Sequence, residues 1–306
     1  MTGPHADLLE ELRPPAFAIA YRMLGSVADA EDVVQEALMR VHRALESGQS
    51  IERPQAYVAT VATRLAIDQL RSARARRETY VGEWLPEPLV TDDLGDPVRQ
   101  AELADSLSLA FLVLLESLSP EQRAVLLLHD VFGYDYGEIA GIVGTSEVNA
   151  RQLAVRARRH VGDRRPRFEV SRADHAELAQ RFFAAAQDGD LGGLEALLAH
   201  DVVLHGDGGG KVPAIAGPLH GRARVARTLL AWSRQGTKRG AALRQVQVNG
   251  QPGALGLDRA GRLISVMALE IADGQIQRVS SIVNPDKLAH MGPVGDMREL
   301  LKGGGD

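Results

Sequence analysis

The chain has 306 residues, a formal net charge of −5, no cysteine and 9 scattered histidines. This length predicts about two domains, the lack of cysteine excludes disulfides and thiolate-bound metals, and the histidines lack H-E-x-x-H spacing, so we expect no metal and no cofactor. No apolar run approaches the roughly 18 residues of a membrane-spanning helix, and the acidic start MTGPHADLLEELRPP differs from a signal peptide, so we expect a cytoplasmic protein without membrane contact.

Positive charge is concentrated in two places despite the negative total. Seven arginines lie between Arg151 and Arg167, and a second cluster comprises Arg64, Arg71, Arg74, Arg76 and Arg77. An acidic stretch from Glu83 to Asp105 separates them. Two basic segments joined by an acidic one predict two sites of phosphate contact within one chain.

The segment SVADAEDVVQEALMRVHRAL predicts an amphipathic helix. Ser26 and Asp29 form a capping pattern, and the apolar side carries Ala30, Val33, Val34, Ala37, Leu38 and Val41. The opposite face is charged, with Asp29, Asp32, Glu36, Arg40 and Arg43. On its own, such a face is more often simply solvated.

A second helix is predicted over PQAYVATVATRLAIDQLRSARARRE, which opens with Pro54. Tyr57, Val58, Val61 and Leu65 form its apolar stripe, and Thr60, Arg64, Asp68 and Arg71 form a polar one. The basic end is either plain surface or a phosphate-contacting face, and five arginines favour the second interpretation.

The next segment, GEWLPEPLVTDDLGDP, has the Pro, Gly and Asp content of a linker. Trp84 and Leu85 are unexpected in a solvated tether, so we expect them to dock on another part of the chain. The acidic residues of this linker suggest that it repels the phosphates of DNA when the protein has no partner bound.

A helix-turn-helix is the most specific local signal. SPEQRAVLLLHDVFG carries a Ser119 to Gln122 capping box, and YDYGEIAGIVGTSEVNARQLAVRARRHV follows as a short helix, a turn and a longer helix. The longer helix turns Ala150, Leu153, Ala154, Ala157 and Val161 inward and Asn149, Gln152, Arg156 and Arg159 outward. This arrangement favours a helix that enters the DNA major groove. An ordinary helical hairpin with a basic face is the alternative.

After Phe168 the pattern changes to α+β, with helices against a curved sheet. Asp273-Gly274 lies between two strand-like runs and predicts a hairpin. The glycine run HGDGGGKVP resembles a phosphate loop only partly, because Val212 and Pro213 stand where that loop needs Ser or Thr. The final LLKGGGD is predicted to be a frayed tail.

Two further interpretations of this C-terminal part stay open. An enzyme would use His205 with Asp207, or His200 with Asp201, as an acid/base pair. Against catalysis, neighbouring strand residues point to opposite faces, and the glycines after Asp207 favour a close backbone approach. A small-molecule sensor is the other interpretation.

Several of these motifs together resemble one family. ADAEDVVQEALMRV, YVATVATRLAIDQLRSARARRE and YGEIAGIVGTSEVNARQLAVRARRHV resemble the core-binding, minus-ten and minus-thirty-five parts of extracytoplasmic-function (ECF) sigma factors. WLPEP, DGGGK and NPDKL resemble the marks of the subgroup with a fused SnoaL-like domain. Thr63 and Arg64 stand where many members have Arg-Asn, and Leu153 where many have Arg, so promoter preference does not carry over.

The resemblance implies a fold class of two all-α domains, the second a helix-turn-helix, and a C-terminal α+β SnoaL/NTF2-like cone. It implies domain 2 over residues 1–80, the linker over 81–105, domain 4 over 106–166, the SnoaL-like domain over 167–292 and a tail over 293–306. The protein is then a non-catalytic subunit of RNA polymerase, monomeric when free, whose C-terminal domain modulates it in cis.

The resemblance also implies roles for residues. Clamp helices of the largest polymerase subunit would contact Asp29, Asp32, Val33, Gln35, Glu36 and Arg40, and the polymerase flap would contact the second module. The minus-ten strand would meet Thr60, Arg64, Asp68, Arg71 and Arg74. The minus-thirty-five duplex would meet Asn149, Arg151, Gln152, Arg156, Arg158 and Arg159, with Arg158, Arg159, Arg164 and Arg165 mainly on phosphate. Regulatory contacts between domains would use Trp84, Leu85, Asp207, Lys211, Asn284, Asp286 and Lys287.

Two rivals from other classes remain. A one-component regulator, with a ligand domain fused to a helix-turn-helix, predicts DNA binding without polymerase. It leaves the charged helix from Asp29 to Arg43 without a role. An enzyme with an accessory DNA module predicts turnover by an acid/base pair.

Overall fold

The computed structural model describes residues 5–77, 80–91, 106–162 and 172–302. The chain divides into two compact units, one formed by Met1–Thr79 with Leu112–Arg165 and the other by Tyr80–Phe111 with Pro166–Asp306. The linker residues from Tyr80 onward therefore belong with the C-terminal part. Among the described helices, none has the length and apolarity needed to span a membrane.

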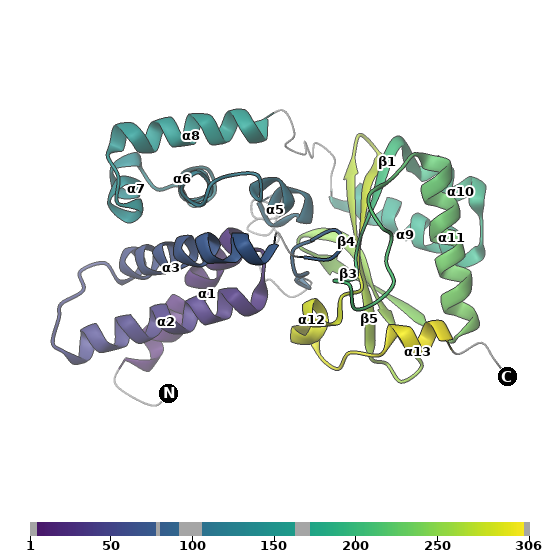
Figure 1. Ribbon diagram of the computed structural model, residues 1–306, viewed down its shortest axis with the longest axis horizontal. Coiled ribbons are helices and arrows are strands. Elements are labelled where there is room, and N and C mark those ends of the chain that lie inside the picture. Colours follow the sequence, from purple (N-terminus) through teal and green to yellow (C-terminus); the bar gives the residue numbers. More distant parts are fainter. Residues whose placement is uncertain (1–4, 78–79, 92–105, 163–171, 303–306) are drawn as a thin grey trace. The chain divides into compact units, whose positions relative to one another are not determined.

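The first half of unit 1 is a three-helix assembly of α1 (Ala6–Leu24), α2 (Val27–Glu46) and α3 (Pro54–Arg77) (Figure 1). Ser26 caps α2, because its hydroxyl accepts a hydrogen bond from the Asp29 amide at 3.2 Å. The apolar side of α2 is buried as its periodicity predicts, from Ala30 through Val41. Ile67 and Leu70 are also buried, so α3 is enclosed on more than one side.

The second half of unit 1 contains α6 (Pro120–Asp130), α7 (Tyr136–Val143) and α8 (Glu147–Gly162), preceded by α5 (Leu109–Leu115). Capping boxes at Ser119 and Asp135 begin α6 and α7. Gly144 ends α7 with a φ of 74°, a left-handed conformation that suits glycine. Val125, Leu128, Ile139, Ile142, Ala150 and Ala154 form the core between the three helices. The predicted helix-turn-helix is confirmed.

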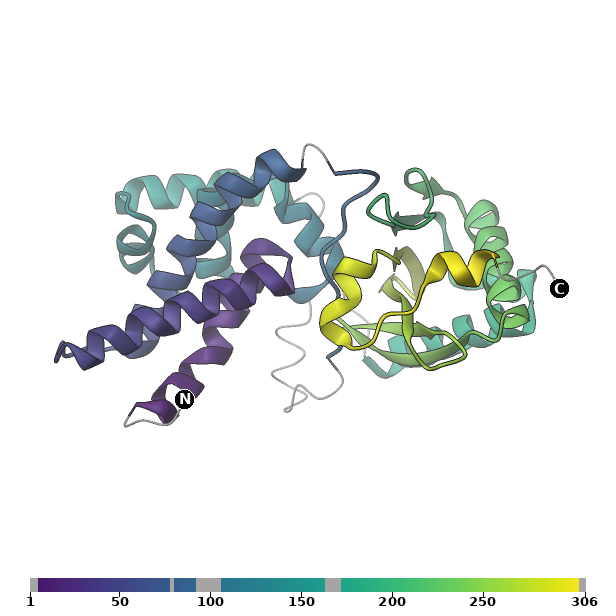
Figure 2. The same cartoon turned by 60° about the horizontal axis from the view of Figure 1, so that its bottom comes forward.

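Unit 2 is an α+β domain built on a six-stranded sheet of order β2-β1-β6-β5-β4-β3. The strands are β1 (Leu198–Asp207), β2 (Leu219–His220), β3 (Ala242–Val248), β4 (Gln251–Leu257), β5 (Leu263–Ala272) and β6 (Gln275–Ile282). The helices are α9 (Arg172–Asp188), α10 (Leu191–Leu197) and α11 (Arg222–Lys238). These helices cover one face of the sheet (Figures 1 and 2). The predicted fold class is confirmed.

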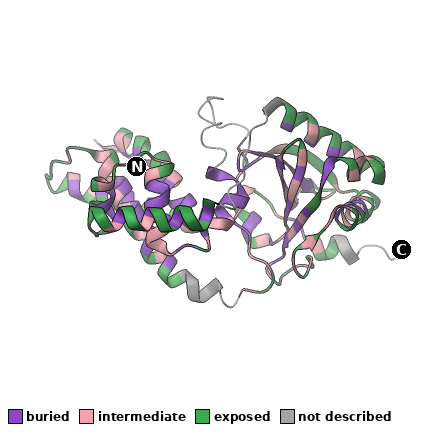
Figure 3. Cartoon of the chain, turned by 90° about the horizontal axis from the view of Figure 1, so that it is seen from above, coloured by how far each residue is buried: buried purple, intermediate pink, exposed green. Residues whose placement is uncertain are grey.

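The core of unit 2 lies between that sheet face and the helices. Phe182, Phe183, Leu194 and Leu229 pack there against Leu204, Leu269 and Val279 of the strands. The helices leave their outer sides exposed, whereas the central strands β1, β6, β5 and β4 are largely buried (Figure 3). Because strand residues alternate between faces, His205, Asp207 and Ser280 lie on the other side of the sheet from Leu204 and Val279.

Two tight hairpins shape the sheet. Asp273 and Gly274 join β5 to β6 with φ values of 52° and 69°, which confirms the predicted hairpin. Asn249 and Gly250 join β3 to β4 in the same way, with φ values of 52° and 73°. The Asn-Gly dipeptide is itself a strong turn signal, although no hairpin was predicted at this position.

The C-terminal segment continues through α12 (Pro285–Leu288), a 3-10 turn (Ala289–Met291) and α13 (Met297–Lys302). The Leu263 amide donates to the Pro293 carbonyl, and the Gly295 amide donates to the Leu263 carbonyl. The prediction of a tail over 293–306 is therefore wrong at its beginning, because residues 293–295 pair with the start of β5.

Candidate functional site

Helix α8 presents a polar surface opposite its buried alanines. Gln152, Arg156 and Arg159 are exposed there. Asn149 is partly buried, and its amide nitrogen donates to the Thr145 hydroxyl at 2.8 Å. The structure thus places together the side chains expected to meet the minus-thirty-five duplex. Arg164 and Arg165 lie outside the described residues.

Two of the predicted DNA-contacting arginines on α8 already have charged intramolecular partners. Arg158 hydrogen-bonds Asp130 of α6 at 2.9 Å, and this bond raises the Arg158 pKa. Burial alone would raise the Asp130 pKa, but the hydrogen bonds and charges of Arg158 and His129 together outweigh it and lower that pKa. Arg151 pairs with Glu147, and its guanidinium lies 5.4 Å from the centre of the Tyr136 ring. Arg156 donates only a long hydrogen bond of 3.5 Å to Gln152, and both are exposed, so Gln152, Arg156 and Arg159 are the members of this set most available to DNA.

The polar stripe of α3 faces the helix-turn-helix in this conformation. Arg64 donates through Nε to the Ile142 carbonyl at 2.9 Å and through Nη2 to the Gly141 carbonyl at 2.7 Å. Both carbonyls belong to the C-terminal end of α7, where a cation is favoured. The Thr60 hydroxyl donates to the carbonyl of Ala56. Four residues of the minus-ten set thus share one helix face, while the side chain of Arg74 lies outside the described part.

Three more arginines join the two halves of unit 1. Arg71 pairs with Asp68 and with Glu121 of α6, and Arg53 pairs with Glu138 of α7 at 2.9 Å. Arg123 of α6 is buried and donates to the Met23 carbonyl of α1 at 2.5 Å and to Glu116 at 2.9 Å. Burial lowers the Arg123 pKa to about 9. These contacts close the proposed minus-ten face against α6 and α7.

The charged face of α2 is mostly exposed, so most of its side chains can meet a partner. Asp32, Gln35 and Arg40 are exposed, and Arg40 donates to Glu36 at 2.7 Å. Asp29 is less free, because Gln69 of α3 donates to it at 2.7 Å. Val33 does not belong to this surface. It is only 3% exposed because it lies on the buried side of α2, so its assignment to polymerase contact is corrected.

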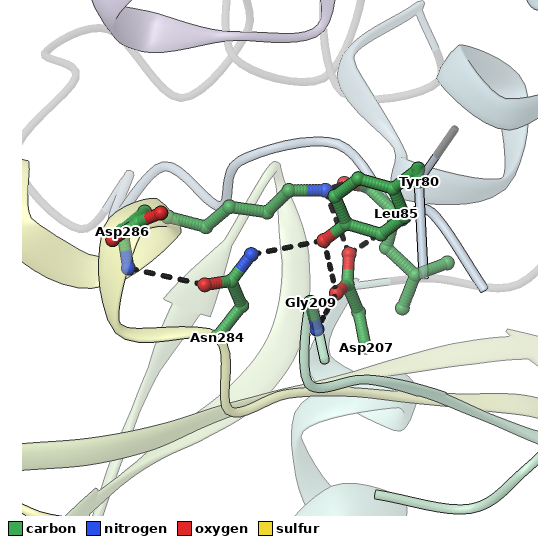
Figure 4. Close-up of polar contacts among 7 residues, drawn as sticks. Tyr80, Leu85, Asp207, Gly209, Asn284 and Asp286 are labelled. Carbon is green, nitrogen blue, oxygen red and sulfur yellow. Dashed lines mark hydrogen bonds and ion pairs between the residues drawn. The ribbon is translucent and has the colours of Figure 1, made fainter. Parts of the chain in front are cut away.

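The linker is fastened to the C-terminal domain by a buried carboxylate at the end of β1. Asp207 is 0% exposed and accepts four hydrogen bonds through its two side-chain oxygens. Oδ1 accepts from the Tyr80 hydroxyl at 2.5 Å and from the Gly209 amide at 3.0 Å. Oδ2 accepts from the Leu85 amide at 2.8 Å (Figure 4). Burial, reinforced by the bond to Asp207, raises the Tyr80 pKa.

Lys287 of α12 provides the counter-charge. Its ammonium lies 2.6 Å from Asp207 Oδ2 and also donates to the Leu85 carbonyl. It lies 4.3 Å from the centre of the Trp84 ring and 4.9 Å from that of Tyr80, within cation–π range. Asn284 extends the network, because its amide nitrogen donates to the Tyr80 hydroxyl at 2.9 Å (Figure 4). The lysine charge is thus paired, hydrogen-bonded and covered by two aromatic rings of the linker.

The glycines of DGGGK allow this close approach. Gly209 and Gly210 have φ values of 58° and 70°, which side chains rarely adopt. A Cβ on Gly209 would lie 2.3 Å from the Asn284 amide nitrogen, and one on Gly210 would lie 2.9 Å from Val81 of the linker. The loop leads to β2 rather than to a helix, and Lys211 pairs with the exposed Asp286, so this is not the geometry of a phosphate loop.

A second set of hydrogen bonds, which was not predicted from the sequence, holds the linker on the edge strand β3. Val90 pairs antiparallel with Val248, and the Thr91 amide donates to the Gln247 carbonyl at 2.9 Å. Asn249, which is fully buried, accepts from the Leu89 amide at 2.8 Å and donates to the Leu107 carbonyl at 2.9 Å. One side chain thus holds chain segments on both sides of residues 92–105, which lie outside the described residues. The Asn-Gly signal locates this turn but not its contacts.

The proposed acid/base pairs are not assembled. His205 and Asp207 do point to the same side of β1, since they are two residues apart, which corrects the argument from alternation. Linker residues contact both side chains: Asp207 accepts from Tyr80 and Leu85, and His205 Nδ1 lies 2.5 Å from Glu83. His200 and Asp201 are exposed. A small cleft lined by Ser108, Gln251, Glu270 and Ser280 has room for about one water molecule.

Comparison with known proteins agrees with this geometry. Residues 8–76 match the model of Sigma-70 region 2, residues 108–161 that of Sigma-70 region 4, and residues 179–282 that of the SnoaL-like domain. The helical unit is therefore a pair of sigma regions and the α+β unit a SnoaL-like domain.

Whole-chain relatives carry the same combination. The chain is 40% identical to the ECF RNA polymerase sigma factor SigJ of Mycobacterium tuberculosis over 288 residues, 91% of each protein. It is 34% identical to the probable ECF sigma factor SigI of that species, over 88% of this chain and 90% of the relative. The crystal structure of SigJ matches with a TM-score of 0.74, covering 93% of this chain and 98% of that one. The chain belongs to the ECF RNA polymerase sigma factors. These are non-catalytic subunits with which RNA polymerase uses promoter DNA.

Proposed function

We propose that the C-terminal SnoaL-like domain regulates this sigma factor in cis by holding the linker that follows the first sigma region. The observation that carries the proposal is the buried Asp207, which bonds Tyr80 and Leu85 of the linker and Lys287 of its own domain. A linker held in this way restricts the separation between the two DNA-contacting modules. Promoter output then depends on the SnoaL-like domain without a separate inhibitory protein.

Within this proposal the sigma regions work as follows. The exposed face of α2, with Asp32, Gln35, Glu36 and Arg40, binds the clamp helices of the largest polymerase subunit, and the second sigma region binds the flap. Asp29 joins the clamp contact if Gln69 releases it. The free protein acts as a monomer in the cytoplasm; its regulatory contacts lie within one chain and need no second copy.

Helix α3 serves the opened minus-ten strand through Thr60, Arg64, Asp68, Arg71 and Arg74. An unpaired strand needs a basic groove with hydrogen-bonding groups, and this stripe offers both. Since Arg64 and Arg71 now contact α7 and α6, the proposed promoter-bound state requires these contacts to open. The conformation described is then a closed, polymerase-free state.

Helix α8 serves the minus-thirty-five duplex. Gln152, Arg156 and Arg159 are exposed for the groove, while Asn149, Arg151 and Arg158 first exchange their present partners. Each bidentate base contact contributes roughly 1 to 3 kcal/mol of discrimination.

A transcription assay tests the regulatory proposal. Core polymerase is mixed with the full chain, and start-site-specific transcripts are measured on promoters selected from a random library. Trp84→Ala and Asp207→Ala should change the transcript yield or the selected promoters, because each weakens the hold on the linker. Circular dichroism checks that the variants remain folded. Unchanged output and selection from both variants would refute regulation through this network.

A further inference from the structure

Two valines on α8 are exposed where the helix would face DNA. Val148 is 68% exposed and Val155 is 55% exposed, and both lie in the proposed minus-thirty-five helix. They are seven residues apart, which is two helical turns, so they lie on one line along the surface. Gln152 lies on that line between them, and Arg159 follows it.

Neither valine has a structural role that explains its position. The buried side of α8 is formed by Ala150, Ala154, Ala157 and Val161, and the line of Val148 and Val155 runs along the opposite side. Valine is also a weaker helix former than the alanines nearby, because its branched Cβ restricts χ1. A single exposed valine needs no explanation, but two on the outermost line of a DNA-facing helix form a pattern.

We infer that Val148 and Val155 determine promoter specificity by contacting thymine methyl groups in the minus-thirty-five element. Thymine is the base that presents a methyl group in the major groove, and apolar side chains recognise it there. The stiffness of valine helps, because its methyl groups lose little rotamer freedom on binding. The inference rests on the proposed binding of α8 to this duplex.

Charge complementarity favours DNA over a protein partner for this stripe. The exposed Arg156 and Arg159 lie beside the valines, and such cations suit the phosphates that line a major groove. Gln152 lies between the valines and suits adenine, which it bonds in bidentate fashion.

The spacing of the valines defines the expected site. Seven residues of helix span about 10.5 Å, which corresponds to about three base pairs of duplex. We therefore expect two thymines about three base pairs apart, on either strand, with the base contacted by Gln152 between them.

The test removes the methyl groups from the DNA. Promoters are first selected with the holoenzyme, and each thymine of the minus-thirty-five element is then replaced singly by uracil, which lacks only the methyl. Holoenzyme affinity is measured with wild type, Val148→Ala and Val155→Ala. Leu243→Ala, which truncates an exposed apolar side chain of the SnoaL-like domain, is the matched control.

The wild type and the control should lose about fourfold in affinity at two thymines, the effect of one methyl contact. Each valine variant should become indifferent to uracil at one of these positions and keep its response at the other. Equal uracil responses in wild type and both variants, or none in the wild type, would overturn the inference. So would a loss of holoenzyme assembly with unchanged promoter affinity, which would assign the valines to a protein partner.

Failure of this inference is distinguishable from failure of the proposed function. If start-site-specific transcripts still form while the valine variants behave as wild type, α8 keeps its role and the thymine contacts are wrong. If no such transcripts form with any variant, the assignment of α8 to promoter DNA is itself wrong, and the inference falls with it.

Discussion

The two units use different kinds of contact to hold their parts together. In unit 1, the ion pairs between the sigma regions lie at the surface, where Arg53 of the Arg53–Glu138 pair is 69% exposed, although the buried Arg123 also joins these regions. In unit 2, the linker is held by groups removed from water, since Lys287 of the Lys287–Asp207 pair is 7% exposed. Exposed ion pairs contribute little to stability and are screened by salt, whereas a buried charge left without its partner is costly. The exposed ion pairs between the sigma regions thus suit opening, whereas the buried contacts of the linker suit holding.

The largest expected effect follows from breaking the buried network. Asp207→Ala leaves the Lys287 ammonium without its carboxylate and three further donors without their acceptor, so unit 2 should lose about 3 to 5 kcal/mol of unfolding free energy. Urea unfolding followed by tryptophan fluorescence measures this loss. Trp84 should become more exposed to a quencher even before unfolding.

The exposed pair Lys211–Asp286 provides the control for that variant. These side chains are 54% and 64% exposed and belong to the same two motifs as Asp207 and Lys287. Asp286→Ala should therefore leave both stability and Trp84 quenching nearly unchanged. Equal losses in the two variants would show that burial is not what distinguishes these contacts.

A smaller effect is expected at the second set of linker contacts, around Asn249. Asn249→Gly keeps the positive φ of the turn but removes the hydrogen bonds to Leu89 and Leu107, which should cost about 1 to 3 kcal/mol. Hydrogen exchange of the segment around Leu89 should become faster, because its amide loses its acceptor.

Asp273→Gly is the matched control, since Asp273 occupies the same position of the other hairpin with the same φ of 52°. It should leave exchange near Leu89 as it is in the wild type. If both glycine variants accelerate exchange equally, the effect comes from the turns themselves and not from the contacts of Asn249.

Much of this architecture follows from local sequence signals. The caps at Ser26, Ser119 and Asp135 begin helices because each signal acts within one turn. Trp84 and Leu85 could be expected to dock because a solvated linker has no use for them. Local patterns do not identify their partners, because Asp207 and Lys287 meet them across long sequence separations, and only the family resemblance named these two residues.

Two features needed the structure. The contact of Arg64 with the end of α7 depends on how two sigma regions pack, which no helical periodicity encodes. Asn249 is the second case, because its Asn-Gly dipeptide predicts a turn while its bonds to Leu89 and Leu107 depend on a segment added to the sheet edge. The assignment of Val33 failed for a simpler reason, since the apolar periodicity of α2 already placed it on the buried side.

The smallest expected effect concerns the closed arrangement of the sigma regions. Raising ionic strength should weaken the pairs Arg53–Glu138 and Arg71–Glu121, because screening acts strongly on exposed charges. The hydrogen bonds from Arg64 to the α7 carbonyls remain, so opening should be partial.

Because the chain has no cysteine, Gln49→Cys and His160→Cys introduce unique sites for a fluorescent donor and acceptor, one in each sigma region. Energy transfer between them should fall modestly with salt. Adding Glu121→Gln and Glu138→Gln should lower the transfer at low salt and remove most of its salt dependence. If the double glutamine variant keeps the full salt response, these ion pairs do not hold the sigma regions closed, and the difference between the two units has another origin.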